Sequence, residues 1–301
     1  MSVSTIKSNK CFGGQLIKLS AKAESYNGLE TKFNVFVPEG KGPFPVLYYL
    51  AGLTCDEDTG ATKGMFEGPA AAHGIALVFP DTSPRGAGIA GEDADWDFGT
   101  GAGFYLDATA PAYASHYRGF TYLTQELPEL LKKSGLPLDL NRQSIMGHSM
   151  GGHGALVLYL KTLALGKYAS CSAFAPITNP TLCPWGTKAF AGYLKGGVEE
   201  GKEWDATELL RSGQAKGELR IRFDWGSADN FFQAGQLLPE NFLGEVKSLG
   251  VGGVVGTQRE GYDHSYYFIM SFAAEHVACE SEFFACCLIQ CSQRSQSTQS
   301  T

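Results

Sequence analysis

The sequence predicts a single α/β domain, with a mostly parallel central β-sheet, an antiparallel edge at its N-terminal end and helices on both faces. Stretches rich in Val, Ile, Phe and Tyr alternate along the chain with stretches of helical periodicity, which is typical of successive β-α-β units. The 301 residues are 44% hydrophobic and 12% aromatic, enough apolar material for one large core. We find no internal repeat and no Pro-, Gly- or Ser-rich linker that would divide the chain.

Strands are predicted where short apolar runs stop at Gly, Pro or Asp. These runs cover residues 13–23, 32–40, 44–52, 75–83, 142–148, 168–176, 218–226 and 252–260. Helices are predicted at 121–135, 150–166, 204–213 and 239–250, and a last long helix begins at about Ser265. No helical pattern separates the first two runs, so we expect them to form the antiparallel edge.

The predicted domain covers residues 1–290 and contains inserted loops at about 82–118 and 176–203. Residues 291–301 are polar and aperiodic, and we expect them to form a disordered tail. Cys279, Cys286, Cys287 and Cys291 have helical spacing in the last helix. Small packed residues are the favoured interpretation of these cysteines, with acylation or metal binding as the alternative.

Charge and cysteine content exclude several classes of function. The formal net charge is −7 and the pI is near 5.4, without a basic patch that would indicate nucleic-acid binding. The N-terminus lacks the apolar stretch of a secretory signal, and no window has the roughly 18 apolar residues of a membrane span. We therefore expect a cytosolic protein that binds neither membrane nor nucleic acid. The cysteines have no paired spacing typical of zinc, so we expect reduced thiols.

The stretch SIMGHSMGGHGAL, residues 144–156, carries the strongest functional signal. It places Ser149 in a G-x-S-x-G pattern between a predicted strand and a predicted helix, which is the setting of a nucleophile elbow. Such a strained turn projects the serine Oγ and requires small neighbours, which Gly151, Gly152 and Gly154 provide. The alternative is that Ser149 only caps the helix, although a cap does not require small residues on both sides.

A serine nucleophile requires a general base, which follows it in the chain order Ser, Asp or Glu, His. His264 is the predicted base because it lies in the loop between the last strand and the last helix. His153 is one helical turn from Ser149 and would point along the helix, and His276 lies well inside the last helix.

The base in turn requires an acid to orient its ring. Asp229 is the predicted acid because it comes just past a strand end, where strand-end loops meet. Asp224, inside the same strand, is the alternative. Asp263 precedes His264 directly in sequence, and the short backbone between them makes a hydrogen bond from its carboxylate to that ring unfavourable.

Acyl transfer also requires hydrogen-bond donors for the negative charge that develops on the carbonyl oxygen. At a nucleophile elbow, one donor is the backbone N–H of the residue after the serine, here Met150, and the other comes from the loop after an earlier strand. The buried strand in YYLAGLTC ends at Gly52, so the N–H of Leu53 is the predicted second donor.

These motifs resemble those of the S-formylglutathione hydrolase family, also called the esterase D family. The likeness runs, in order and to about residue 277, through AGLTC, FPDTSPRG, WDFGTGAGFYLDAT, HYRGFTYLTQELP, GHSMGGHGAL, APITNPTLCPWGTKAFAGYL, GSADNF and GYDHSYYFI. The resemblance implies an α/β-hydrolase fold, a cytosolic homodimer, a triad of Ser149, Asp229 and His264, and an oxyanion hole of Leu53 and Met150.

The reaction that the resemblance implies is hydrolysis of S-formylglutathione to glutathione and formate through a formyl-serine, without metal or organic cofactor. Cys55 matches a family cysteine near the active site, and Lys63, Trp96 and Trp185 are further candidates for substrate binding. A solvated lysine and ordinary packing of the other three are the alternatives. For the whole protein, the alternatives are a general short-chain carboxylesterase or acetylesterase, and a non-catalytic binding protein, which would have a broken triad.

Overall fold

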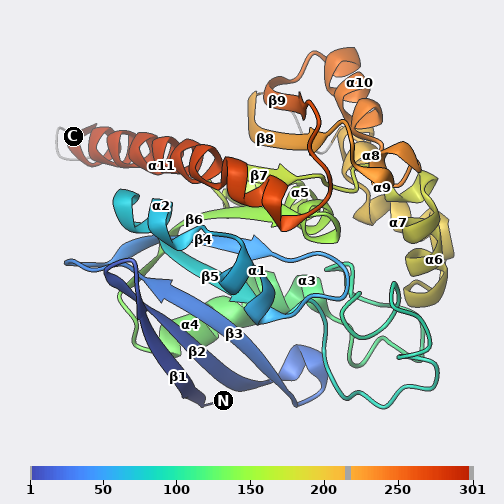
Figure 1. Cartoon of the computed structure of the whole chain (residues 1–301), viewed down its shortest axis with the longest axis horizontal. Helices are drawn as coiled ribbons and strands as arrows, with labels where there is room; N and C mark the ends of the chain where they lie inside the picture. The colour runs from blue at the N-terminus through green and yellow to red at the C-terminus, as the bar shows by residue number, and fades with distance from the viewer. Residues whose placement is uncertain (1, 214–217, 298–301) are drawn as a thin grey trace.

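The computed structural model describes residues 2–213 and 218–297, with side chains as far as residue 284. Within these residues the chain forms a nine-stranded sheet in the order β1-β2-β3-β5-β4-β6-β7-β8-β9 (Figure 1). Neighbours from β5 to β9 pair parallel, whereas β1, β2, β3 and β5 pair antiparallel. This confirms the predicted sheet. The strands span Val3–Cys11 (β1), Gly14–Ala23 (β2), Leu29–Val37 (β3), Phe44–Leu50 (β4), Ala76–Pro80 (β5), Leu138–His148 (β6), Cys171–Phe174 (β7), Glu218–Gly226 (β8) and Gly252–Arg259 (β9).

Helices cover both faces of the sheet, as predicted. One face carries α1 (Glu57–Lys63), α2 (Glu67–His73) and α11 (Tyr266–Ser297), and the other carries α4 (Leu127–Lys133), α5 (Met150–Thr162), α8 (Ala206–Arg211) and α10 (Pro239–Leu249) (Figure 1). The short α3 (Gly119–Thr121) precedes α4. The remaining helices, α6 (Pro184–Tyr193), α7 (Gly197–Gly201) and α9 (Asn230–Gln233), gather with the irregular segment 82–118 at the right of Figure 1.

The hydrophobic pattern does not predict β1, because most of its residues are polar and exposed. A tight turn at Phe12 and Gly13, with φ angles of 46° and 79°, folds β1 back along β2. Backbone pairing across this turn therefore forms the strand without a buried face.

The core is continuous through the middle of the sheet. Every residue of β4 and β5 is buried, as expected where helices cover a parallel sheet on both faces. In α5, all residues except Lys161 are buried, because this helix lies between the sheet and α8. The strand-turn-helix unit of Ser149 thus lies at the centre of the fold.

Two predicted segments differ in detail from the structure. The predicted loop 176–203 contains α6 and α7, which are short and rich in glycine, so their periodicity is weak. The last helix, α11, continues to Ser297, so the predicted tail 291–301 lies partly in this helix, and residues 298–301 lie outside the described residues. The side chains of Cys286, Cys287 and Cys291 also lie outside the described part, whereas Cys279 is half-buried. The extent of the domain stays a prediction.

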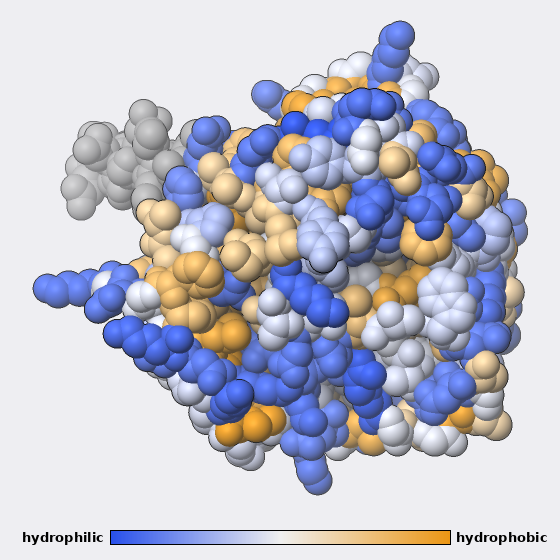
Figure 2. All heavy atoms as spheres, in the orientation of Figure 1, coloured by the Kyte–Doolittle hydropathy of each residue, from blue (hydrophilic) through white to orange (hydrophobic). Residues whose placement is uncertain are grey.

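The helices of the described ranges differ in length or in hydropathy from a membrane span. No helix there is both long enough and apolar enough to cross a bilayer. On the face drawn in Figure 2, hydrophilic residues are interspersed with groups of hydrophobic ones.

Candidate active site

Ser149 occupies a sharp turn between the end of β6 and the start of α5. Its φ of 58° and ψ of −119° lie in a region that residues with a side chain rarely adopt. Three backbone hydrogen bonds hold this conformation. The Ser149 N–H donates to the Phe174 carbonyl at 2.9 Å, and the Ser149 carbonyl accepts from the N–H groups of His153 at 2.9 Å and Ile177 at 3.3 Å. The Ser149 side chain makes no capping hydrogen bond with α5, so the helix-cap alternative has no support in the geometry. The turn has the form of a nucleophile elbow.

Glycines allow the elbow to approach the end of β4. A Cβ added to Gly151 would lie 1.9 Å from the Leu50 carbonyl oxygen, far inside van der Waals contact. A Cβ added to Gly52 would lie 3.2 Å from the Cβ of Ser149. The start of α5 and the loop after β4 therefore meet directly at the serine, which a side chain at Gly151 would prevent.

His264 and Asp229 form a hydrogen-bonded pair, with 2.5 Å between Nδ1 and Oδ2. Asp229 also caps α9, because its Oδ1 accepts from the N–H groups of Phe231 at 2.8 Å and Phe232 at 3.2 Å. The Asp229 carboxylate is fully buried, whereas 13% of the His264 side chain is exposed. Since Nδ1 faces the carboxylate, Nε2 is the ring nitrogen left to exchange a proton.

Two further rings hold the imidazole of His264 beside the elbow. The ring of His148, the residue before Ser149, lies 4.5 Å from the His264 ring between centroids, and Phe231 contacts His264 edge-on at 4.8 Å. Burial holds the pKa of His148 well below its usual range, so its ring is neutral. Sequence reasoning missed both residues, although the position of His148 inside G-x-S-x-G was an available signal.

The other two aspartates have different partners. Asp224 is fully buried, and its Oδ2 lies 2.5 Å from a guanidinium nitrogen of Arg259 and 3.7 Å from Nε2 of His276. Asp263 accepts from the N–H of Ser265 at 3.0 Å and lies at the surface. Of the three candidate acids, Asp229 is the one that the structure pairs with the predicted base.

The other two candidate histidines are packed in the core. Nε2 of His153 lies 3.2 Å from the Phe104 carbonyl oxygen, and burial lowers the pKa of His153 to about 4. His276 stacks on Phe174 with 3.9 Å between ring centroids, and burial lowers its pKa as well. Both rings are fully buried, so neither is placed to exchange protons with a substrate.

The N–H groups of Leu53 and Met150 lie on two segments that flank the serine. Met150 is the first residue of α5, and Leu53 follows Gly52, which packs against Ser149. Among the described residues, neither N–H donates to a backbone carbonyl outside the regular elements. Two backbone donors beside one nucleophile are the arrangement that an oxyanion hole requires.

Aromatic rings continue outward from His264 to the surface. Phe231 contacts Trp185 at 4.7 Å, and Trp185 contacts Trp96 edge-on at 5.8 Å, both between ring centroids. Trp185 is 5% exposed and Trp96 is 56% exposed. Both predicted tryptophans therefore lie on one path that begins at the candidate base.

An ion-pair cluster fixes the segment that carries Trp96. Lys188 of α6 pairs with Asp95 at 2.9 Å and also with Asp97, on either side of the tryptophan. Trp185 belongs to the same helix, so the segment with the exposed indole is attached to α6 by two ion pairs and one aromatic contact.

Cys55 and Lys63 lie near opposite ends of α1. The Cys55 carbonyl accepts from Thr82 Oγ1 at 2.6 Å and from Arg85 at 3.0 Å, and burial raises the pKa of the thiol. Lys63 is exposed in the last turn of α1. Cys55 comes two residues after Leu53, whereas no contact within the described ranges links Lys63 to the candidate triad.

The acidic residues that follow Cys55 have structural partners. Asp56 caps α1 by accepting two backbone N–H groups at 3.1 Å each. Glu57 and Asp58 pair with Lys18 of β2 at 2.7 Å and 2.5 Å. Two of these three carboxylates therefore share one lysine of β2, which leaves part of their negative charge uncompensated by that contact.

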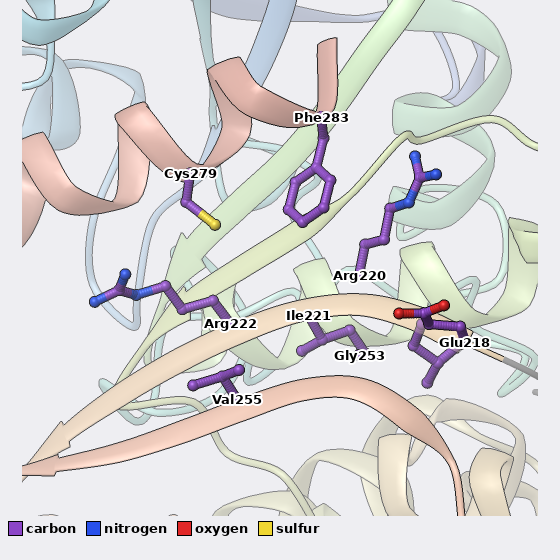
Figure 3. A pocket seen from close by; sticks show the side chains of 9 residues that line it. Glu218, Arg220, Ile221, Arg222, Gly253, Val255, Cys279 and Phe283 are labelled. Carbon is purple, nitrogen blue, oxygen red and sulfur yellow. The ribbon is translucent and has the colours of Figure 1, made fainter. Parts of the chain in front are cut away.

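A cavity of about 330 Å³ lies between β8, β9 and α11, apart from the candidate triad (Figure 3). Its lining includes Arg220, Arg222 and Phe283, and the Arg220 guanidinium lies 5.4 Å from the Phe283 ring centroid. None of the predicted site residues lines this cavity. In the part of the chain that the structure describes, no group of three or more His, Cys, Asp or Glu side chains could hold a metal ion.

The fold and the elbow define the class of the protein. A mostly parallel sheet that presents a strained serine between a strand and a helix is the architecture of the α/β-hydrolases. Residues 25–279 match the family model described as "Putative esterase".

Relatives narrow this class to one family. An S-formylglutathione hydrolase of Mus musculus is 46% identical over 279 residues, which cover 92% of this chain and 97% of that protein. One of Arabidopsis thaliana is 43% identical and covers 92% of this chain and 96% of its own. The solved structure of an S-formylglutathione hydrolase from Agrobacterium tumefaciens is 38% identical, has a TM-score of 0.88, and covers 94% of this chain and all of its own. The chain therefore belongs to the S-formylglutathione hydrolase family of esterases.

Proposed function

We propose that this protein hydrolyses S-formylglutathione to glutathione and formate. The relatives that bear this name match nearly the whole chain, at 46% and 43% identity. The observation that carries the proposal is the 2.5 Å hydrogen bond between Asp229 and His264, whose ring packs against the residue preceding the strained Ser149. This pair supports the proposal because a histidine oriented by a carboxylate is the general base that a serine hydroxyl requires to become nucleophilic at neutral pH.

In the first half of the reaction, Ser149 Oγ attacks the thioester carbonyl carbon while His264 Nε2 takes the hydroxyl proton. The buried carboxylate of Asp229 stabilises the resulting imidazolium. The N–H groups of Leu53 and Met150 donate to the oxyanion. The C–S bond then breaks, the sulfur takes the proton from His264, and glutathione leaves a formyl-serine behind.

In the second half, water repeats the attack on the formyl ester. His264 takes a proton from this water and returns it to Ser149 Oγ as the C–O bond to the serine breaks. Formic acid leaves and ionises to formate. A thioester is already an activated acyl group, so these protein groups are sufficient for both halves.

The path from Phe231 through Trp185 to Trp96 is proposed to bind the thiol part of the substrate. Formyl is the smallest acyl group, so nearly all of the substrate's bulk lies on the thiol side of the scissile bond. An exposed indole fixed by α6 offers a flat apolar surface for a peptide. Cys55 is proposed to border the site next to Leu53, and Lys63 to meet a glutathione carboxylate.

We further propose that the protein acts as a cytosolic homodimer, as its family resemblance implies. Size-exclusion chromatography with light scattering tests the dimer, since a monomeric mass at micromolar concentration contradicts it. Fractionation of the native host tests the compartment.

The reaction is tested by measuring turnover of S-formylglutathione and p-nitrophenyl acetate by the purified protein and by Ser149→Ala. We expect a strong preference for the thioester and near-complete loss of both activities in the variant. Comparable efficiency on the two substrates would instead favour a general short-chain carboxylesterase. Full activity without the Ser149 hydroxyl would exclude the mechanism.

The thiol subsite is tested separately with Trp96→Ala. We expect KM for S-formylglutathione to rise several-fold, with kcat and the kinetics of p-nitrophenyl acetate unchanged, because the small ester does not reach the indole. An equal change for both substrates would contradict a role specific to the thiol.

A further inference from the structure

Three successive hydrogen bonds anchor the loop after β4 around the Leu53 N–H. The carbonyl of Ala51 accepts from the Tyr105 hydroxyl at 2.7 Å, and the carbonyl of Gly52 accepts from the Cys55 N–H at 3.3 Å. The N–H of Thr54 donates to the Gly101 carbonyl at 2.9 Å. Because each peptide unit is planar, these three bonds fix the unit that carries the Leu53 N–H and the units on both sides of it.

Two of the three anchors come from one distant segment, residues 99–105. Gly101 packs so closely that an added Cβ would lie 3.2 Å from Thr54 Cα. Tyr105 is 3% exposed, and its hydroxyl reaches Ala51 from 54 positions away in the chain. Of the three hydrogen bonds, two therefore come from residues 99–105, and one joins two residues within the loop after β4.

The ring of Tyr105 also contacts the helix that carries the other predicted donor. A Cβ added to Gly154 of α5 would lie 2.5 Å from this ring, so the ring rests on the backbone of the helix. Met150 begins α5 one turn earlier. One side chain thus touches both segments of the oxyanion hole, the loop through its hydroxyl and the helix through its ring.

The backbone around this tyrosine has positive φ angles, as Ser149 does. Phe104 and Tyr105 have φ angles of 51° and 55°, and Thr54 has a φ of 67°. Left-handed backbone is unfavourable for residues with a side chain and persists where surrounding contacts impose it. Positive φ angles at Tyr105 and within the loop that it contacts indicate that the fold imposes this arrangement at a conformational cost.

We propose that Tyr105 is a positioning residue of the oxyanion hole, which uses its hydroxyl to hold the loop of Leu53 in register with the N-terminus of α5. The inference rests on the proposed function, in which the N–H groups of Leu53 and Met150 bind the oxyanion. The Tyr105 hydroxyl does not touch substrate. Burial raises the pKa of this phenol well above its usual range, so it remains a donor across the working pH range.

The test is Tyr105→Phe, which removes the hydroxyl and keeps the ring on α5. Tyr48→Phe is the matched control, because Tyr48 is equally buried and its hydroxyl donates to Gln143 Oε1 at 2.8 Å, away from the elbow. Both variants lose one buried hydrogen bond, so both should lose similar thermal stability. The readouts are kcat and KM for p-nitrophenyl acetate and for S-formylglutathione, with circular dichroism melting curves.

We expect Tyr105→Phe to lower kcat about 10-fold for both substrates with KM within twofold of the parent, because a loosened donor weakens transition-state binding alone. Tyr48→Phe should keep kcat within twofold. A boronic acid inhibitor, which mimics the tetrahedral intermediate, should bind Tyr105→Phe about 10-fold more weakly. Gly101→Ala, which disturbs the anchor at Thr54, should show the same loss of kcat without a rise in KM.

An unchanged kcat in folded Tyr105→Phe would overturn the inference, as would an equal loss of kcat in Tyr48→Phe. If the parent protein cleaves p-nitrophenyl acetate but not S-formylglutathione, the proposed substrate is wrong while the oxyanion test still applies to the acetate. If the parent protein cleaves both and kcat is insensitive to Tyr105→Phe, the proposed function stands and the inference about Tyr105 fails.

Discussion

The pairing of Asp229 with His264 leads to the sharpest prediction about catalysis. In Asp229→Asn the side-chain oxygen would remain on the N–H groups of Phe231 and Phe232, which the carboxylate Oδ1 accepts now. The amide NH₂ would then face His264 Nδ1 at the position of the present 2.5 Å bond. Since an NH₂ group only donates, Nδ1 would have to accept, and the ring proton would move to Nε2. A protonated Nε2 cannot take the proton of Ser149.

The expected loss follows from this wrong tautomer. A substitution of this kind lowers kcat by about 10⁴-fold, equivalent to about 5.5 kcal/mol of transition-state stabilisation. Asp229 is fully buried, so solvent would not replace the lost carboxylate. The hydrogen bonds to α9 would remain, so we expect melting temperatures close to that of the parent protein.

The assay is the initial rate on p-nitrophenyl acetate and S-formylglutathione at pH 7.5, with two aspartate controls. Asp263→Asn, next to His264 in sequence, should keep kcat within about twofold because Asp263 bonds to Ser265 at the surface. Asp224→Asn should lower stability and reduce kcat less than about 10-fold, because its partner is Arg259. A folded Asp229→Asn variant with more than a tenth of the parent kcat would refute the reasoning, and so would a larger loss in Asp224→Asn.

Three further predictions concern stability. Gly151→Ala should abolish activity or folding, because the new Cβ would lie 1.9 Å from a carbonyl oxygen of β4. The control is Gly244→Ala in α10, where an added Cβ meets nothing within 4 Å. In urea titrations this control should leave the free energy of unfolding unchanged or raise it by up to about 1 kcal/mol. Burial raises the pKa of the Glu280 carboxyl to about 7 from an ordinary value of 4.5, so its contribution to stability is full below pH 4.5 and is lost as the pH rises to 7. Glu280→Gln should therefore raise the free energy of unfolding by up to about 3 kcal/mol at pH 8 and leave it unchanged at pH 4, and identical pH profiles would refute this. Lys18→Met should destabilise the folded protein by about 1 to 3 kcal/mol, because Glu57, whose side chain is 6% exposed, would lose its charged partner. In thermal melts, the double variant with Glu57→Gln should recover part of this loss.

Much of the sheet could be predicted from the sequence because its strands are buried on both faces. β4 and β5 are continuous apolar runs, and such runs next to Gly, Pro or Asp are strong local signals. β1 had no such signal, since a polar strand at the sheet edge depends on a turn and on pairing with its neighbour. The short helix α6 was missed for a related reason: its ten residues are held by contacts with distant segments.

The site residues likewise divide into those with a local sequence signal and those that depend on tertiary contacts. The positions of Ser149, Asp229 and His264 relative to strand ends can be read along the chain, and the structure brings the last two into contact. Their roles stay predictions. The contact of Tyr105 with Ala51 could not be predicted, because it joins residues 54 positions apart through an irregular segment. The packing of His148 on His264 likewise depends on tertiary folding, which residue spacing does not encode.

The ion pairs around Asp224 have a consequence for the loop that carries His264. Arg259, at the end of β9, lies 2.5 Å from Asp224 and 2.8 Å from Glu275, which lies further along α11, so one guanidinium joins the two elements that flank the six-residue connection 260–265. A loop between two joined elements has little conformational freedom. The His264 imidazole therefore loses its positional entropy when the protein folds, before substrate binds. The reaction then begins with the base already in place. On this basis, the temperature at which activity is lost should equal the melting temperature of the whole protein, because the loop is not expected to unfold before β9 and α11 do.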